Sequence, residues 1–368
     1  MHLGFVLIPY QRYTGAGEYY QHLIKAILRL DTANKYTIFF QKGADTAVFK
    51  DCKNVSCVYT PIHWGPGALR YLETITTGFF NSYKPSVDVL HCFNFPLPNL
   101  YKGKIVFTAY DLREEDLPES YGRIHRLAMM FLAPRGLKRA DHIITISKFT
   151  QERLEINYPL CRGKSTAIYL AADPSEVIPQ SAGMQALHRR PYLFAIGQIA
   201  PHKNIANLIL AFNILVKRGC DYDLVIAGHN YRSPEFVEKL QGLAVDKNRV
   251  IFTGRISNQD KMAFLKHAKL FVFPSLYEGF GIPILEAFTL QTPQAVSRIP
   301  VFEELFGFPE AMFDPKSPEE IANVIERICT NQPLRNGIVS YGIKKLEEFT
   351  WEKTARATLS IYDNLARS

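Results

Sequence analysis

The stretch LFVFPSLYEGFGIPILEAF, residues 270–288, decides the fold of this chain. An apolar run of strand length ends at Pro274 and Ser275, a short glycine-rich loop follows, and a second apolar run continues at helical spacing. Glycines let backbone N–H groups approach a ligand closely, and a helix N-terminus adds partial positive charge at the same place. Because open parallel sheets bind ligands at the carboxyl ends of their strands, this segment predicts an anion site suited to a diphosphate.

Two carboxylates frame this loop. Glu278 precedes its glycines, and Glu286 lies in the following helix. A carboxylate repels a diphosphate, so both side chains are predicted to accept hydrogen bonds from sugar hydroxyls. The alternative is that Glu278 is a turn residue and Glu286 a solvated helix position.

A second segment, LFAIGQIAPHKNIANLILAF (193–212), has the same layout. A strand is predicted to end at Gly197, and Asn204 is a suitable N-cap for the next helix. The loop between them carries Gln198, His202 and Lys203. Lys203 can offer a mobile point charge to a phosphate, although an ordinary solvated lysine is the alternative. His202 is as compatible with a surface position as with a phosphate contact.

Strand-length apolar runs alternate with helical patterns along the whole chain. The alternation occurs twice and is interrupted by a proline-containing stretch that suits a linker. This pattern predicts an α/β fold with two doubly wound parallel-sheet domains, as the length of 368 residues also suggests. We expect an N-terminal domain at 1–171, a linker at 172–190, a C-terminal domain at 191–348 and a terminal helix at 349–368.

The net charge of +8 points to an anionic partner. Nucleic acid, a membrane surface and a phosphorylated small molecule all fit, but the spread of charge over both halves disfavours nucleic acid. The six cysteines form no CxxC pair. No signal peptide or apolar run of spanning length is recognisable, so a cytoplasmic protein is predicted.

The most basic stretch is GRIHRLAMMFLAPRGLKRAD, residues 122–141. Its basic residues are Arg123, Arg126, Arg135, Lys138 and Arg139, and its apolar block is Leu127, Met129, Met130, Phe131 and Leu132. Such a helix can lie on an anionic bilayer, at the inner face of the membrane. The alternative is a helix packed on the sheet with a solvated basic face.

Taken together, these segments resemble the retaining nucleotide-sugar glycosyltransferases of family 4, also called group 1. The family's Glu-x7-Glu motif is matched by Glu278 and Glu286, and its glycine–lysine loop resembles Gly197 to Asn204. The resemblance covers nearly the whole chain. Further matching segments are 15–27, 87–98, 107–112, 140–154 and FTWEKTA at 349–355.

The resemblance implies the GT-B arrangement, in which two Rossmann-like domains face each other across a cleft and the last helix crosses back to the N-terminal domain. It implies transfer of a hexose from a UDP- or GDP-sugar, with retention, to a saccharide or lipid-linked acceptor in polysaccharide or cell-surface glycan synthesis. No metal or other cofactor is expected. A nucleotide-sugar epimerase and a catalytically silent nucleotide-sugar-binding partner subunit are the alternatives, the latter because Gln198 and Tyr110 replace residues often charged in the family.

The resemblance also implies roles for individual residues. The catalytic set is Lys203, Glu278, Tyr110 and Asp111. The donor-binding set is Gly197, Gln198, His202, Lys203, Gly254, Arg255, Ile256, Glu278, Gly279, Phe280, Gly281, Ile282 and Glu286. The acceptor-binding set in the N-terminal domain is Gly15, Ala16, Gly17, His91 and Ser147.

Overall fold

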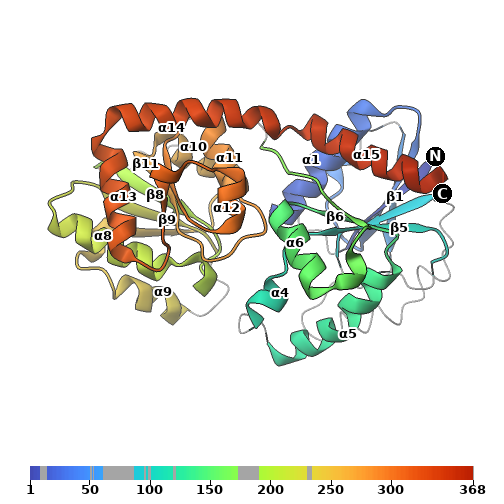
Figure 1. Ribbon diagram of the computed structural model, residues 1–368, viewed down its shortest axis with the longest axis horizontal. Helices are drawn as coiled ribbons and strands as arrows, with labels where there is room; N and C mark the ends of the chain where they lie inside the picture. Colours follow the sequence, from blue (N-terminus) through green and yellow to red (C-terminus); the bar gives the residue numbers. More distant parts are fainter. Residues whose placement is uncertain are drawn as a thin grey trace. The chain divides into compact units, whose positions relative to one another are not determined.

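The computed structural model describes residues 1–8, 15–49, 52, 54–60, 87–94, 97, 101–118, 122–172, 190–229 and 234–367. The chain divides into two compact units. The first is Met1–Leu170 together with Thr350–Ser368, and the second is Ala171–Phe349. Most of the expected linker at 172–190 lies outside the described residues. Each unit contains one parallel sheet with helices on both sides of it (Figure 1), so the expected pair of parallel α/β sheets is confirmed.

The sheet of the first unit has the strand order β3-β2-β1-β4-β5-β6-β7. Its strands are β1 His2–Leu7, β2 Lys35–Gln41, β3 Val55–Thr60, β4 Val89–Cys92, β5 Lys104–Ala109, β6 His142–Thr145 and β7 Ser165–Ala167. The strands near its centre are buried almost throughout, which explains why they read as continuous apolar runs. The helices are α1 Gly15–Leu30, α4 Arg113–Asp116, α5 Arg123–Arg139, α6 Lys148–Asn157 and α15 Trp351–Arg367.

Helix α15 belongs to the first unit, although it ends the chain. It lies along α1 and also contacts β4 and β5 (Figure 1). The Trp351 ring stacks on His22 with 5.2 Å between centroids, and the Thr354 hydroxyl donates to the Tyr169 carbonyl at 2.7 Å. The last helix therefore completes the core that the first 170 residues begin.

The sheet of the second unit has the order β10-β9-β8-β11-β12-β13, and all its pairs are parallel. Its strands are β8 Tyr192–Ile196, β9 Asp223–Ala227, β10 Val250–Gly254, β11 Leu270–Phe273, β12 Gln294–Ser297 and β13 Met312–Phe313. Its helices are α8 Ile205–Lys217, α9 Pro234–Gln241, α10 Asn258–His267, α11 Ile282–Thr289, α12 Pro300–Leu305, α13 Pro318–Thr330 and α14 Gln332–Lys345. The chain adds strands on one side of β8 and then on the other, so β8 and β11 flank a topological switch point.

None of the helices in the described part of the chain is long and apolar enough to cross a membrane. Within the same residues, no group of three or more His, Cys, Asp or Glu side chains could hold a metal ion.

Candidate active site

The switch point of the second unit brings the two motif-bearing loops together. The loop after β8 and the loop after β11 are joined by two hydrogen bonds. The Leu276 N–H donates to the His202 carbonyl at 2.7 Å, and the Asn204 side chain donates to the Pro274 carbonyl at 3.0 Å. Parallel neighbours end at the same edge of the sheet, which is why residues 70 positions apart in the sequence meet here.

Asn204 links the loops instead of capping a helix. Its backbone is left-handed, with φ of 58°, and its side chain makes no capping bond to α8. The amide also donates to the Pro315 carbonyl at 2.6 Å, and the residue is buried. The prediction of a side-chain N-cap is therefore wrong, because this amide is used to hold the loop in place.

Lys203 and Glu278 form an ion pair at this junction. Their side chains are 15% and 16% exposed, so both are largely withdrawn from water. The same Glu278 oxygen accepts the Ser275 hydroxyl at 2.7 Å, and the Lys203 ammonium lies 5.5 Å from the centroid of the Phe273 ring. Lys203 is thus not an ordinary solvated lysine, and Glu278 is more than a turn residue.

Glu286 is buried in α11, which contradicts the alternative of a solvated helix position. Its Oε1 accepts from the Lys261 ammonium of α10 at 2.5 Å. Its Oε2 is buried and has no hydrogen-bond partner in the structure. A buried carboxylate oxygen without a partner is costly, and a sugar hydroxyl would satisfy it.

Three glycines line the strand ends beside these pairs. Gly197 directly follows β8, Gly228 directly follows β9, and Gly254 is the last residue of β10. Their φ angles are 152°, 156° and 70°. A Cβ on Gly228 would stand 1.7 Å from the Gly197 carbonyl oxygen, so only glycine fits. After Gly254, Arg255 is exposed and Ile256 is half-buried.

The loop that leads into α11 is packed tightly. Gly279, Phe280 and Gly281 are buried, and Ile282 begins the helix. A Cβ on Gly281 would lie 3.1 Å from both Ile284 Cδ1 and Phe302 Cε1. In the other loop, His202 is buried and Gln198 is half-buried. The expected donor-binding residues of the two loops therefore gather at the ends of β8 and β11.

In the first unit, His91 belongs to the core. Its Nδ1 lies 2.5 Å from the Tyr362 hydroxyl and its Nε2 lies 2.7 Å from the Thr108 hydroxyl. Burial lowers the pKa of His91 to about 3, so the ring is neutral. The expected acceptor contact through His91 does not fit this geometry, because both ring nitrogens are engaged inside the core.

Tyr110 is directed into a cluster of tyrosines. Its ring meets Tyr19 edge-on at 5.8 Å between centroids and lies 6.0 Å from Tyr20. Its hydroxyl oxygen is buried, and burial raises the pKa of Tyr110 well above its usual value. A contact of this hydroxyl with a reacting sugar, as expected from the sequence, is not consistent with that position. The neighbouring Asp111 is half-buried and accepts from the Arg113 N–H at 3.2 Å.

Ser147 is the N-cap of α6. Its fully buried hydroxyl accepts from the Thr150 N–H at 3.0 Å and bonds the Thr150 hydroxyl at 2.9 Å. This structural role accounts for Ser147 better than the expected acceptor contact. Gly15 and Ala16 begin α1, and Gly17 is buried with its carbonyl accepting from the Gln21 amide at 3.1 Å.

Comparison with known proteins decides the family. Residues 181–345 match the family described as "Glycosyl transferases group 1". The chain is 26% identical over 282 residues to O-antigen chain mannosyltransferase B of Escherichia coli, covering 74% of each protein. Residues 181–345 therefore belong to the group 1 glycosyltransferases. The chain is also 32% identical over 183 residues to the serotype-specific mannosyltransferase WbdA of Escherichia coli, a match that spans 48% of this chain but only 22% of WbdA.

The fold of this group 1 glycosyltransferase is GT-B-like. The sucrose-phosphate synthase of Thermosynechococcus elongatus superposes with a TM-score of 0.79 over 100% of both chains, at 19% identity. The expected family resemblance, enzyme class and fold are therefore confirmed.

Three residues of the site were not found from the sequence of this group 1 glycosyltransferase. Lys261 pairs with Glu286, Ser275 donates to Glu278, and Gly228 makes room for the backbone at Gly197. The sequence signal for Ser275 is a hydroxyl residue at a strand end beside a glycine-rich loop. For Lys261 no local signal exists, because its partner is 25 residues away on another helix.

Proposed function

We propose that this enzyme transfers a hexosyl group from a nucleotide sugar to a saccharide or lipid-linked acceptor, with retention of configuration. The observation that supports it most is that two lysines pair with the two carboxylates that flank the glycine-rich loop before α11. One pair is Lys203 with Glu278, and the other is Lys261 with Glu286. Each pair places a cation beside a carboxylate that can accept hydrogen bonds. A nucleotide sugar has both anionic oxygens and hydroxyl groups, so it matches this mixture.

The diphosphate is assigned to the loop after β8 and the N-terminus of α11. When the anomeric bond breaks, negative charge develops on the leaving diphosphate. A preorganised cation aimed at that charge is commonly the largest catalytic contribution, and Lys203 is our candidate for it. The helix N-terminus at Ile282, behind Gly279 and Gly281, adds partial positive charge.

The rest of the donor is assigned to the two carboxylates and the loop after β10. Glu278 accepts from hydroxyls of the transferred sugar, and Glu286 accepts from the ribose through its unpartnered oxygen. Gly254, Arg255 and Ile256 hold the base. Of the residues expected in the first unit, Gly15, Ala16 and Gly17 at the start of α1 stay in the proposal for the acceptor, and Asp111 after β5 stays in it as a catalytic residue.

Mannose is the sugar we propose for transfer, in the synthesis of a polysaccharide or cell-surface glycan. The support is that the two curated relatives compared above are both called mannosyltransferases. GDP-mannose is therefore the first donor to test, with UDP-glucose and other UDP-sugars as the competing donors. Nucleotide sugars are cytoplasmic metabolites, so we propose that the transfer takes place there.

The test combines donor binding with transfer. Thermal unfolding is followed with GDP, UDP, GDP-mannose and UDP-glucose, and donors that shift the midpoint are assayed for transfer and hydrolysis. Stabilisation by none of these, or by free phosphate alone, would contradict the proposal.

Lys203→Met tests the charge assignment. We expect kcat to fall by about 100-fold or more, as when one preorganised donor is removed from an active site. Lys203→Met leaves the Glu278 carboxylate without its ion-pair partner, which can lower the stability of the protein. The double variant Lys203→Met/Glu278→Gln removes both charges, so comparing it with Lys203→Met separates the effect of the lost lysine charge from that of lost stability. Lys217→Met, at an exposed site on α8, is the matched control. Unchanged turnover in Lys203→Met would refute the assignment.

A further inference from the structure

Helix α5 presents a stripe of apolar side chains to solvent. The exposed fractions of Leu127, Met130 and Phe131 are 56%, 66% and 59%. These residues are spaced three and four positions apart, so they lie on one side of the helix. Single exposed apolar residues are ordinary on a protein surface, but three together on one helix mark an interaction site.

Basic side chains flank this stripe. Arg123, Arg126, Arg135 and Lys138 are exposed, and α5 contains no acidic residue. The Arg135 guanidinium carbon lies 5.8 Å from the centroid of the Phe131 ring, and its Nη1 donates to the Phe131 carbonyl at 2.9 Å. Positive charge and apolar surface are thus interleaved on the same face of the helix.

Acidic residues that flank α5 in the chain are held by other partners. Asp116 pairs with Arg153. Glu115 accepts the Tyr158 hydroxyl at 2.5 Å, and Asp141 pairs with Arg139 at 3.1 Å. Each of these three carboxylates therefore has a partner outside the exposed face of α5.

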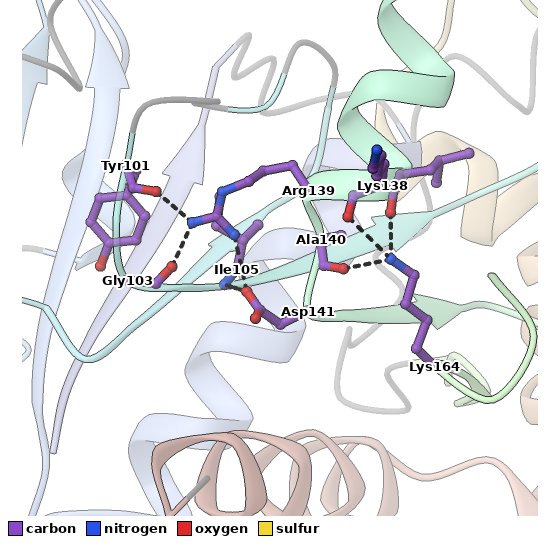
Figure 2. A network of polar contacts seen from close by, with 9 residues as sticks. Tyr101, Gly103, Ile105, Lys138, Arg139, Ala140, Asp141 and Lys164 are labelled. Atoms are coloured by element: carbon purple, nitrogen blue, oxygen red, sulfur yellow. Dashed lines mark hydrogen bonds and ion pairs between the residues drawn. The ribbon is translucent and has the colours of Figure 1, made fainter. Parts of the chain in front are cut away.

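The opposite side of α5 is fixed to the first unit, where Ala133 and Leu137 are buried. Figure 2 shows how its C-terminal end is held. The Lys164 ammonium donates to the carbonyls of Leu137 at 2.7 Å and Ala140 at 2.8 Å. A lysine that satisfies the last carbonyls stabilises a helix end. The exposed stripe is therefore presented by an anchored helix.

Arg139 takes part in the same network and faces inward. Its guanidinium donates to the carbonyls of Tyr101 and Gly103 and to the Asp141 carboxylate (Figure 2). The sequence-based view of Arg139 as part of a membrane-facing basic series is therefore wrong. Its guanidinium donates hydrogen bonds to backbone carbonyls just before β5. Of the five basic residues, only the four exposed ones lie on the exposed side of α5.

We propose that this surface of α5 docks the enzyme on an anionic lipid bilayer. The docking face is Arg123, Arg126, Leu127, Met130, Phe131, Arg135 and Lys138. A helix surface that combines apolar side chains with cations can lie on the membrane interface, with the apolar side chains at the acyl boundary and the cations among anionic headgroups. The proposal does not depend on the donor or the acceptor, because binding to vesicles is measured without turnover.

Co-sedimentation of the full chain with vesicles tests the proposal. One set contains phosphatidylglycerol and phosphatidylcholine in equal parts, and the other contains phosphatidylcholine alone. We expect strong binding to the anionic vesicles at low salt, release at high salt, and little binding to the neutral vesicles. Absence of binding to the anionic vesicles at low salt, or equal binding to both sets, would overturn the proposal.

Variants assign the binding to this face. Each basic residue near an anionic surface is worth roughly a factor of five in the partition coefficient, so Arg126→Gln/Arg135→Gln should lower it roughly 25-fold. Leu127→Gln/Phe131→Gln should lower it as well, with unchanged thermal unfolding. Val245→Gln/Lys247→Gln is the matched control, since Val245 is 63% exposed and Lys247 is also exposed in the second unit.

Wild-type binding by both α5 variants would refute the assignment. Sedimentation velocity without lipid gives a second test. A dimer of the wild type that the Leu127→Gln/Phe131→Gln variant no longer forms would also refute the assignment. In that case a second copy of the chain would be the occupant of this face.

Discussion

Acidification should destabilise the first unit through His91. The ring is buried, neutral and bonded to Tyr362 of α15 and Thr108 of β5. Its pKa falls from an ordinary value of 6.5 to about 3 on folding. Between these two values the unfolded chain binds a proton that the folded chain does not, so stability is complete above the ordinary pKa and is lost as the pH falls toward 3.

The size of the effect follows from the two pKa values. For one such group, the free energy of unfolding drops by about 2 kcal/mol between about pH 7 and pH 5, and by about 1.4 kcal/mol per unit below that. In His91→Gln this contribution is absent, whereas an amide can still bond both hydroxyls. The variant should therefore lose less stability on acidification than the wild type, whatever its stability at neutral pH.

Urea unfolding followed by tryptophan fluorescence measures this difference. Both tryptophans of the chain, Trp64 and Trp351, fall within the residue ranges of the first unit. Carboxylates and other histidines titrate in both proteins, so subtracting the two pH profiles isolates His91. Identical pH profiles for the wild type and His91→Gln would refute the reasoning.

Three further substitutions are expected to have separate effects. Lys261→Met leaves the buried Glu286 carboxylate unpaired, so the free energy of unfolding measured in urea should fall by about 3–5 kcal/mol. The KM for the donor should rise. If Lys261→Met/Glu286→Gln is as unstable as Lys261→Met, the reasoning is wrong. Gly228→Ala should lower the free energy of unfolding by about 3 kcal/mol, because the new Cβ collides with backbone atoms. Gly337→Ala is the control, since the nearest atom to its Cβ is 3.9 Å away. In thermal unfolding this control should be neutral or stabilising. Ser147→Ala removes the cap of α6 and should cost about 1 kcal/mol without altering the KM for the acceptor. An altered acceptor KM would instead support an acceptor-side role.

The sequence predicted the features that depend on local pattern. Apolar runs located the strands because these strands are buried on both faces. The glycine-rich loops located the donor side because strand ends and helix starts coincide there. Glu278 and Lys203 followed from these positions, and the structure pairs them.

The features that failed depend on which way a side chain faces. His91 and Tyr110 were correctly placed near strand ends, and Arg139 was correctly placed in a basic helix. Whether such a residue points to a ligand or into the core is decided by partners distant in sequence, such as Tyr362 for His91. Pattern and spacing carry no information about those partners. For the same reason the pairing of Lys261 with Glu286 was not predicted from the sequence.

The placement of α15 has a consequence for how the protein is made. The second unit is one continuous piece of chain, but the first unit needs residues from both ends. His91 and Tyr362, which share a hydrogen bond, are separated by 271 positions. During translation the second unit can therefore fold before α15 is synthesised, whereas the first unit cannot cover β4 and β5 until α15 has left the ribosome. A stop codon placed before α15 would accordingly damage the unit whose synthesis began first.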